Sequence, residues 1–410
     1  MKVAVVGGFP PNREGEAHYT GCVFRAFATQ YPQAHVRVIA HRQPDAPDAS
    51  SFASNGDIVR ATDGYHRWRR HLTPLQVYRS LRAYAPDVVH FQAPHKGLYG
   101  GLYGEPLLWV FRWLRRKRIP TVVTLHSLWL EEDFREMASE RRLSESKRRA
   151  LQRLYRRYHW QLFRAATQVN ALVAGDQNPL IQEFQELWGL TPFCIENEAH
   201  PCEPRAYTRE QSQRAKESLG FVHRKLVLAF GFVRPDKGFH YLMEAAGALI
   251  GAVPTLQLLI AGEPRGGQGQ AYAQQLQARY EQMGCPDQIR LHLNYLSDDA
   301  LEQLLLAADV LVVPYTRVMG ASGPVHHALS LGKPVVATAI GQNRGLAEVC
   351  WLVPPHDASA LAAALQQLLT DDARWDDYHR RARDYAATHT WRHLATQYYQ
   401  DYQRLLERVR

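Results

Sequence analysis

Two basic residues on one short loop are the clearest chemical signal in this sequence. Arg234 and Lys237 stand in GFVRPDKG (231–238), which follows the apolar segment KLVLAF and precedes a helical pattern. Both side chains are therefore expected to project from a loop at the carboxyl end of a strand. An arginine can bind two phosphate oxygens at once and a lysine acts as a point charge, so the pair suits a diphosphate. In isolation the motif would be interpreted as a solvated turn, and the pattern GxxxxGK[ST] is absent.

A second stretch, Asp309–Thr338, also favours an anion. Two short apolar runs flank a segment that opens with a turn of small residues, a pattern typical of strand, turn, helix and strand. Ser322 and Gly323 would then lie at a helix N-terminus, where backbone N–H groups and the helix dipole attract a phosphate. An ordinary turn capped by a serine explains the same residues equally well. The presence of Arg234 and Lys237 upstream favours the phosphate.

The first half of the chain offers two histidines and a glycine-rich loop. His126 ends the apolar run TVVTLH and His90 lies near the end of DVVHF, so both are candidate site residues, whereas a histidine on a strand face would be packed core. The loop Gly7–Gly15 follows the first apolar run. The motifs GxSxG and HExxH are absent. The acidic run at 131–136 is interpreted as a solvated or lid segment.

An alternating α/β framework is needed to position these residues. Apolar runs alternate with helical patterns in both halves, which predicts parallel sheets with crossover helices. The polar segment 197–208 predicts a linker. We expect two Rossmann-like, doubly wound domains facing a central cleft, namely residues 1–203, with a last helix at 391–410 packing back onto them, and residues 204–390. Strands are expected at 2–6, 35–40, 87–92, 121–126, 169–173, 193–196, 225–230, 256–261, 289–293, 310–313 and 335–337.

The composition is compatible with this architecture. A chain of 410 residues exceeds the size at which one core usually divides, and 46% hydrophobic with 22% charged residues is typical of globular proteins. No apolar run reaches the length of a membrane span, and the N-terminal MKVAVVGG is interpreted as a strand, not a signal peptide. The five scattered cysteines lack CxxC spacing, which indicates a reduced, cytoplasmic protein without disulfides or a zinc site.

The net charge of +9 is concentrated in the first half. Residues 1–205 hold 28 Lys and Arg against 20 Asp and Glu, whereas the remainder holds 21 and 20. Basic residues cluster at 111–118 and at 146–164. Solvation of a surface helix explains the second cluster as well as contact with an anionic membrane or an acidic acceptor does. No nucleic-acid-binding motif accompanies the charge, so nucleic acid is not an expected partner. The arginines of the second cluster include Arg148, Arg149, Arg153, Arg156, Arg157 and Arg164.

In order and spacing, the segments resemble those of GT-B glycosyltransferases of family 4, retaining enzymes that use nucleotide sugars. The resemblance runs from VAVVGGFPPNREGEAHYTG through DVVHFQ, TVVTLHS, GFVRPDKGF, LLIAGE and ADVLVVPY to ASGPVHHALSLGKPVVAT and GLAEVCWLVPPHDASALAAAL, nearly the whole chain. It implies that the second domain holds most of the nucleotide sugar. It also implies that catalysis needs no metal or other cofactor and has no firmly established nucleophile.

The same resemblance assigns roles to particular residues. Arg234 and Lys237 match the pair that binds the donor diphosphate and stabilises the departing nucleoside diphosphate. Gly15 matches the loop that approaches the donor phosphates, and His126 matches the histidine near the transferred sugar. Tyr295 lies where the base is usually received.

The sequence departs from this family at one motif. Members commonly carry two glutamates separated by seven residues, the first near the donor sugar and the second on the ribose. Counting back from LSLGKPVVAT places His327 at the second position and Met319 at the first. An imidazole can still hydrogen-bond a ribose hydroxyl, whereas Met319 cannot replace the sugar-binding carboxylate. Ser322 and Gly323 are kept, which favours a bound anion.

We therefore expect a hexosyltransferase-class enzyme that moves a sugar from a nucleoside-diphosphate-sugar to a hydroxyl acceptor, with retention, in polysaccharide biosynthesis. The expected partners are the nucleotide sugar, a glycan or lipid-linked acceptor, and an anionic membrane surface reached through the basic N-terminal half. The expected location is cytoplasmic, peripheral on the inner face of the membrane. Because the glutamate pair is missing, a non-catalytic homologue that binds a nucleotide or glycan is the main alternative. A nucleotide-sugar epimerase is a third interpretation, disfavoured by the lack of cleft acids.

Overall fold

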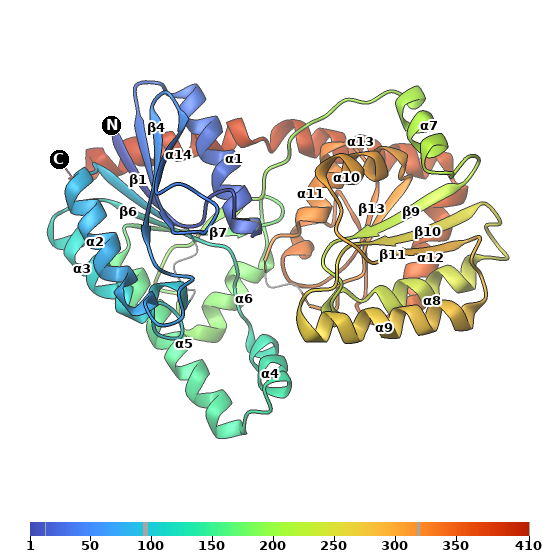
Figure 1. The fold of residues 1–410 in the computed structure, drawn as a ribbon, viewed down its shortest axis with the longest axis horizontal. Helices are drawn as coiled ribbons and strands as arrows, with labels where there is room; N and C mark the ends of the chain where they lie inside the picture. The colour runs from blue at the N-terminus through green and yellow to red at the C-terminus, as the bar shows by residue number, and fades with distance from the viewer. Residues whose placement is uncertain (13, 93–96, 318–319, 410) are drawn as a thin grey trace. The chain divides into compact units, whose positions relative to one another are not determined.

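The first sheet is built from the N-terminal half of the chain. In the computed structural model, which describes residues 1–12, 14–92, 97–317 and 320–409, its order is β3-β4-β2-β1-β5-β6-β7-β8 (Figure 1). All neighbours are parallel except β3 and β4. Central strands are buried along their whole length, as in sheets covered on both faces. The strands are β1 (Lys2–Val6), β2 (His35–His41), β3 (Ala49–Ala53), β4 (Gly56–Thr62), β5 (Val88–Gln92), β6 (Thr121–Leu125), β7 (Gln168–Val173) and β8 (Glu196–Ala199).

Helix α14 (Trp391–Val409), near the end of the chain, packs on helix α1 (Gly15–Gln30). Tyr31 stacks on Tyr399 with ring centroids 3.9 Å apart, and Phe24 packs against Tyr398 at 5.8 Å. Residues Met1–Ala199 and Trp391–Arg410 accordingly form one compact unit. Its other helices are α2 (Thr73–Tyr84), α3 (Leu108–Arg116), α4 (Glu131–Glu140), α5 (Glu145–Ala165) and α6 (Pro179–Trp188), with 3-10 turns η1 (Arg70–Leu72), η2 (Gly97–Tyr99) and η3 (Glu105–Leu107).

The second unit, His200–Thr390, contains a parallel sheet in the order β11-β10-β9-β12-β13-β14. No helix in the described part of the chain is both long and apolar enough to cross a bilayer. The strands are β9 (Lys225–Phe230), β10 (Leu256–Ala261), β11 (Ile289–His292), β12 (Val310–Val313), β13 (Val335–Thr338) and β14 (Trp351–Val353). The helices are α7 (Arg209–Ser218), α8 (Phe239–Leu249), α9 (Gly266–Met283), α10 (Asp298–Ala307), α11 (Gly323–Ser330), α12 (Ala358–Thr370) and α13 (Asp372–Thr388), with 3-10 turns η4 (Pro235–Lys237) and η5 (Gly341–Leu346).

The predicted fold class, α/β with two Rossmann-like parallel sheets, is confirmed, and several elements differ from those expected. The antiparallel hairpin β3–β4 was not expected, although Asn55–Gly56 at its turn is a common hairpin signal. Strand β8 begins where the expected strand 193–196 ends. Phe193 instead packs from a loop against Trp160 and Phe163. Helices α4 and α7 and strand β14 were also unexpected.

Candidate functional site

The candidate site of the second unit lies where the strand order changes direction. Strands β9 and β12 are neighbours, but β9 continues outward to β10 and β12 continues to β13 on the opposite side. In open parallel sheets, ligands bind at such a switch point, beyond the carboxyl ends of the strands. GFVRPDKG follows β9, and the segment leading to Ser322 follows β12. The sheet order therefore brings together the two sequence segments that favour phosphate binding, GFVRPDKG and the turn at Ser322.

Backbone contacts hold these two loops against each other. The N–H of Thr316 donates to the carbonyl oxygen of Asp236 at 3.0 Å. Gly238, which ends η4, has a φ of 62°, and a Cβ there would lie 2.0 Å from the carbonyl oxygen of Pro314. Only glycine combines this backbone conformation with so close an approach. The last residue of GFVRPDKG thus positions the basic loop.

The two loops line a pocket of about 240 Å³. Nε of Arg234 donates to Asp236 at 2.8 Å, and Nζ of Lys237 lies 3.9 Å from the same carboxylate. Nζ of Lys237 also lies 3.7 Å from the ring centre of Tyr315. With Arg317, the lining side chains carry three positive charges and one negative charge, a balance that attracts a doubly charged anion. The lining residues are Arg234, Asp236, Lys237, Tyr315, Arg317, Gly320, Ala321, Ser322, Gly323 and Pro324.

Ser322 brings a polar group to this pocket that has no partner among the described residues. The residue is only 5% exposed, and its Oγ makes no hydrogen bond within the described ranges. The residue is the N-cap of α11, yet its side chain does not cap the helix. A buried polar atom without a partner costs about 1–3 kcal/mol, and a ligand oxygen would satisfy it. Gly323 begins the helix, so the positive end of the helix dipole lies at the same place.

The other predicted residues of the second unit do not line this pocket. His327 is half-buried on α11, with its ring centre 6.3 Å from that of Phe230 at the end of β9. Tyr295 follows β11 and is 57% exposed. Met319 lies outside the described residues. The structure therefore groups Arg234, Lys237, Ser322 and Gly323, and it leaves His327 and Tyr295 apart from that group.

His326, which was not predicted, supports the turn at Ser322. It is buried, and its Nδ1 lies 2.8 Å from the carbonyl oxygen of Ser322. Because a carbonyl only accepts, Nδ1 carries the proton. The ring stacks on His200 with centroids 4.0 Å apart, and burial lowers the pKa of His326 to about 4, so the ring is neutral near pH 7. Only the adjacent histidine pair in the sequence could have drawn attention to it.

In the first unit, His126 directly follows β6, at the carboxyl end of the sheet as expected. Its Nε2 lies 2.6 Å from Oε1 of Gln92, the last residue of β5, and its ring packs edge-on against Tyr19 at 5.0 Å. Gly15 is the exposed first residue of α1, and an added Cβ there would meet nothing within 4 Å. Acidic residues stand on both sides of Gly15 in the sequence, at positions 14 and 16, and their charge opposes an anion at this turn.

A buried carboxylate that no motif revealed lies in the core of the first unit. Glu198 of β8 accepts hydrogen bonds from the hydroxyls of Tyr19 and Tyr398, the latter at 2.8 Å. It also accepts from Nδ2 of Asn170 at 2.8 Å and from Oγ1 of Thr124 at 3.1 Å. These partners are all neutral. Burial raises the pKa of Glu198, although the hydrogen bonds favour the charged form.

His90 belongs to the same core. It is fully buried in β5, with Nδ1 2.6 Å from the hydroxyl of Tyr402 and Nε2 2.8 Å from Oγ1 of Thr124. Burial lowers the pKa of His90 to about 3, so the ring is neutral at ordinary pH. His90 is therefore packed core, the alternative that the sequence left open.

Two protein-family models match the chain, one in each unit. The Glycosyltransferase Family 4 model matches residues 23–182, and the Glycosyl transferases group 1 model matches residues 224–371. A D-inositol 3-phosphate glycosyltransferase from Corynebacterium diphtheriae is 26% identical over 368 residues, which cover 82% of this chain and 80% of that protein. The protein of the same name from Corynebacterium urealyticum is 31% identical over 204 residues, and that match spans 48% of this chain and 47% of the relative.

Solved structures share the architecture. Sucrose-phosphate synthase from Thermosynechococcus elongatus aligns over 100% of both chains with a TM-score of 0.74 and 20% sequence identity. HepE from Anabaena, solved in complex with UDP, aligns over 98% of this chain and 100% of its own with a TM-score of 0.70 and 16% identity. At such identities the likeness shows the fold. With a matching family model in each unit, the chain belongs to glycosyltransferase family 4 and has the GT-B fold.

Proposed function

We propose that this chain transfers a sugar from a nucleoside-diphosphate-sugar to a hydroxyl acceptor, with retention at the anomeric carbon. The observation that carries the proposal is the pocket at the switch point of the second unit. Arg234 and Lys237 line it together with the Oγ of Ser322, which has no partner in the described part of the chain, beside a helix N-terminus. Cations, a hydroxyl and a helix dipole together are suited to the oxygens of a diphosphate. HepE, a structural neighbour, was solved with UDP, which agrees with this assignment.

In this proposal the two cations act mainly on the leaving group. Negative charge grows on the nucleoside diphosphate as its bond to the sugar breaks, and preorganised cations stabilise that charge in the transition state. Asp236 holds both cations beforehand, so little reorganisation is needed when the charge develops. No three His, Cys, Asp or Glu side chains in the described ranges group as metal ligands would. We assign the charge stabilisation to Arg234 and Lys237 and propose no cofactor besides the donor itself.

The remaining roles follow the family resemblance. We assign His126 to the transferred sugar, Gly15 to the approach of the donor phosphates, Tyr295 to the base and His327 to the ribose. An imidazole at position 327 can donate to or accept from a ribose hydroxyl, depending on its tautomer. Met319 would lie near the sugar without a carboxylate to bind it.

We further propose that the acceptor is a glycan or a lipid-linked molecule, used in polysaccharide biosynthesis at the inner, cytoplasmic face of a membrane. The relatives named above act, by their names, on D-inositol 3-phosphate, a hydroxyl acceptor that bears a phosphate. The basic first half of this chain is suited to an acidic acceptor of this kind or to an anionic membrane surface.

The proposal is tested by assaying purified protein for transfer and for slow donor hydrolysis with a panel of UDP-, GDP- and ADP-sugars. Arg234→Ala and Lys237→Ala are each expected to lower turnover on the order of 10²-fold or more, as loss of one transition-state donor does. Arg380→Ala is the matched control, because this exposed arginine pairs only with Asp377 among the described residues. Turnover that the two pocket variants leave unchanged would contradict the assigned role.

A non-catalytic nucleotide-binding protein is the second candidate, and one observation favours it. The family's glutamate pair is replaced by His327 and Met319, so a carboxylate toward the sugar is missing. Calorimetry with UDP and GDP, beside the turnover assay, separates the two. Tight binding of a nucleoside diphosphate without turnover of any donor supports the second candidate, whereas turnover excludes it.

A further inference from the structure

One segment of the first unit carries an excess of positive charge as large as the net charge of the whole chain. Residues 64–118 contain 11 Lys and Arg residues but only two acidic residues, Asp87 and Glu105. The rest of the chain contains 38 basic and 38 acidic residues. Residues 64–118 therefore carry nine excess positive charges in about an eighth of the sequence.

Helices α2 and α3 of this segment each carry, on one face, a row of large apolar and arginine side chains, which we call a stripe. Leu75, Tyr78, Arg79 and Arg82 follow the spacing i, i+3, i+4, i+7 on α2, and Trp109, Arg112, Trp113 and Arg116 follow the same spacing on α3, so each set shares one helix face. The stripes are adjacent, because Tyr78 packs against Trp109 at 5.2 Å and Trp113 at 4.8 Å. Figure 1 shows α2 and α3 side by side at one side of the first sheet.

The turn before α2 extends this surface with more cations. Arg67 and Arg70 are exposed there, and the 3-10 turns η1 and η2 pack against each other. We call the combined surface the basic face. Its cations are Arg67, Arg70, Arg79, Arg82, Arg112, Arg115, Arg116, Lys117 and Arg118, all exposed.

The cations of the basic face are not neutralised by the protein itself. Across the described ranges none of them forms an ion pair with a carboxylate; their neighbour Arg69 does, with Asp63. The two acids of the segment are engaged elsewhere. Glu105 accepts from the backbone N–H groups of Leu102 and Tyr103, and Asp87 accepts from the N–H of Lys2. Concentrated like charge of this kind opposes folding, so it indicates an external anionic partner.

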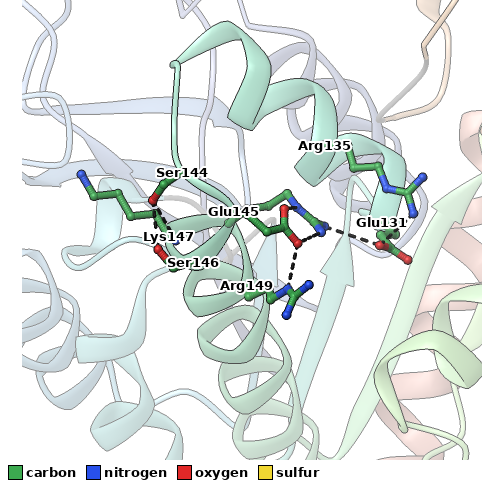
Figure 2. Close-up of polar contacts among 8 residues, drawn as sticks. Glu131, Arg135, Ser144, Glu145, Ser146, Lys147 and Arg149 are labelled. Carbon is green, nitrogen blue, oxygen red and sulfur yellow. Dashed lines mark hydrogen bonds and ion pairs between the residues drawn. The ribbon is translucent and has the colours of Figure 1, made fainter.

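The second basic cluster of the sequence, residues 146–164 on α5, differs from the basic face at its start. Arg148 is 12% exposed and pairs with Glu145 and Glu131, Arg149 pairs with Glu145, and Arg135 pairs with Glu131. Figure 2 shows these ion pairs around the first turn of α5. Local carboxylates thus neutralise the arginines at this end of the 146–164 cluster, which makes them poor contacts for a distant anion.

Large apolar side chains are exposed among the unpaired cations. Trp68 is 75% exposed, Leu102 is 55% exposed, and Leu75 and Trp109 are each 39% exposed. Tryptophan and leucine side chains of this kind enter the interface of a bilayer, where tryptophan is enriched. Lysine and arginine beside them meet the phosphates of anionic headgroups. A polyanion without an apolar phase would leave the apolar side chains unsatisfied.

We propose that the basic face docks the first unit on a bilayer that contains anionic phospholipids. Headgroup phosphates accept from the arginines of α2 and α3, while Trp68, Leu75 and Leu102 enter the interfacial layer. The inference rests on the proposed function only for its purpose, which is access to a lipid-linked acceptor. The docking itself needs neither donor nor acceptor.

Sedimentation with vesicles tests the proposal. Wild-type protein is expected to bind vesicles of phosphatidylcholine mixed with phosphatidylglycerol. It is not expected to bind vesicles of pure phosphatidylcholine. Arg79→Gln combined with Arg82→Gln should weaken binding about 30-fold, because each cation near an anionic surface contributes roughly fivefold. The matched control combines Arg135→Gln with Arg149→Gln, which removes the same charge from exposed but ion-paired arginines and should change binding less than threefold.

Other outcomes would overturn the proposal. These are equal losses in the two double variants, equal binding to neutral vesicles, or binding to heparin or single-stranded DNA without binding to vesicles. Circular dichroism and thermal unfolding verify that both variants fold. Transfer to a water-soluble acceptor is measured in parallel. Loss of vesicle binding with transfer intact supports docking as a separate property, whereas absent transfer with intact docking counts only against the proposed function.

Discussion

Replacing Ser322 by alanine should affect stability and ligand binding in opposite directions. The Oγ of Ser322 is buried, does not cap α11 and has no partner among the residues that the structure describes, so its removal deletes none of the hydrogen bonds described there. It also relieves the desolvation cost of a buried hydroxyl, so the free energy of unfolding should stay the same or rise by up to about 2 kcal/mol. A hydrogen bond to a charged phosphate oxygen contributes about 1.5–3 kcal/mol. Its loss should therefore weaken nucleoside diphosphate binding about 10- to 150-fold.

The assay pairs calorimetric titration of UDP and GDP with urea unfolding of the same samples. Ser330→Ala on the same helix is the control, because its Oγ donates to the carbonyl oxygen of His326 at 2.7 Å and accepts from the N–H of Glu203 at 3.0 Å. That variant should lose stability, since the partly buried N–H of Glu203 and the carbonyl of His326 lose their partner. The reasoning about the pocket is refuted if Ser322→Ala destabilises the protein as Ser330→Ala does while nucleotide affinity stays unchanged.

Three further changes test other parts of the molecule. Burial raises the pKa of Glu198 in the folded state, so the stability linked to its protonated form is present in acid and is lost as pH rises through the folded pKa. Glu198→Gln cannot ionise, so in urea unfolding its stability relative to wild type should shift in its favour as pH rises through the folded pKa of Glu198, and parallel pH profiles would contradict this. Gly238→Ala forces a left-handed conformation that costs about 1–2 kcal/mol, besides the clash with Pro314, and should lower both the melting temperature and UDP affinity. His126→Ala should lower turnover about 10²-fold and leave UDP affinity within twofold, since its unit does not contain the pocket that we propose for the diphosphate. A matching loss of UDP binding would argue against the role of His126.

The sequence pointed to the pocket that we propose for the diphosphate because that pocket is built from local signals. GFVRPDKG and the turn at Ser322 each follow an apolar strand, and such loops lie at the carboxyl edge of a parallel sheet. Periodicity alone did not show that β9 and β12 are neighbours, which is a property of strand order. The close approach of Gly238 to Pro314 depends on that order, so it emerged only from the structure.

Charge counting along the chain had a similar limit. Both 111–118 and 146–164 are rich in arginine, and the sequence could not separate them. The structure distinguishes only the start of the second cluster, because Glu131 and Glu145 lie within reach of Arg148, whereas no carboxylate pairs with Arg116 in the described part of the chain. Whether a cation is available to a partner depends on contacts between elements, and these are not encoded in the local pattern.

Residues outside any sequence motif determine the orientation and the tautomer of the His126 ring. Nε2 of His126 lies 2.6 Å from Oε1 of Gln92, and an amide oxygen only accepts, so Nε2 carries the proton. In the neutral ring Nδ1 is then the nitrogen that accepts. Tyr19 packs against the ring and donates to Glu198, which also accepts from Tyr398 of α14. The orientation and tautomer of a candidate site histidine thus depend on a buried network that extends to the last helix, because buried polar groups must satisfy one another.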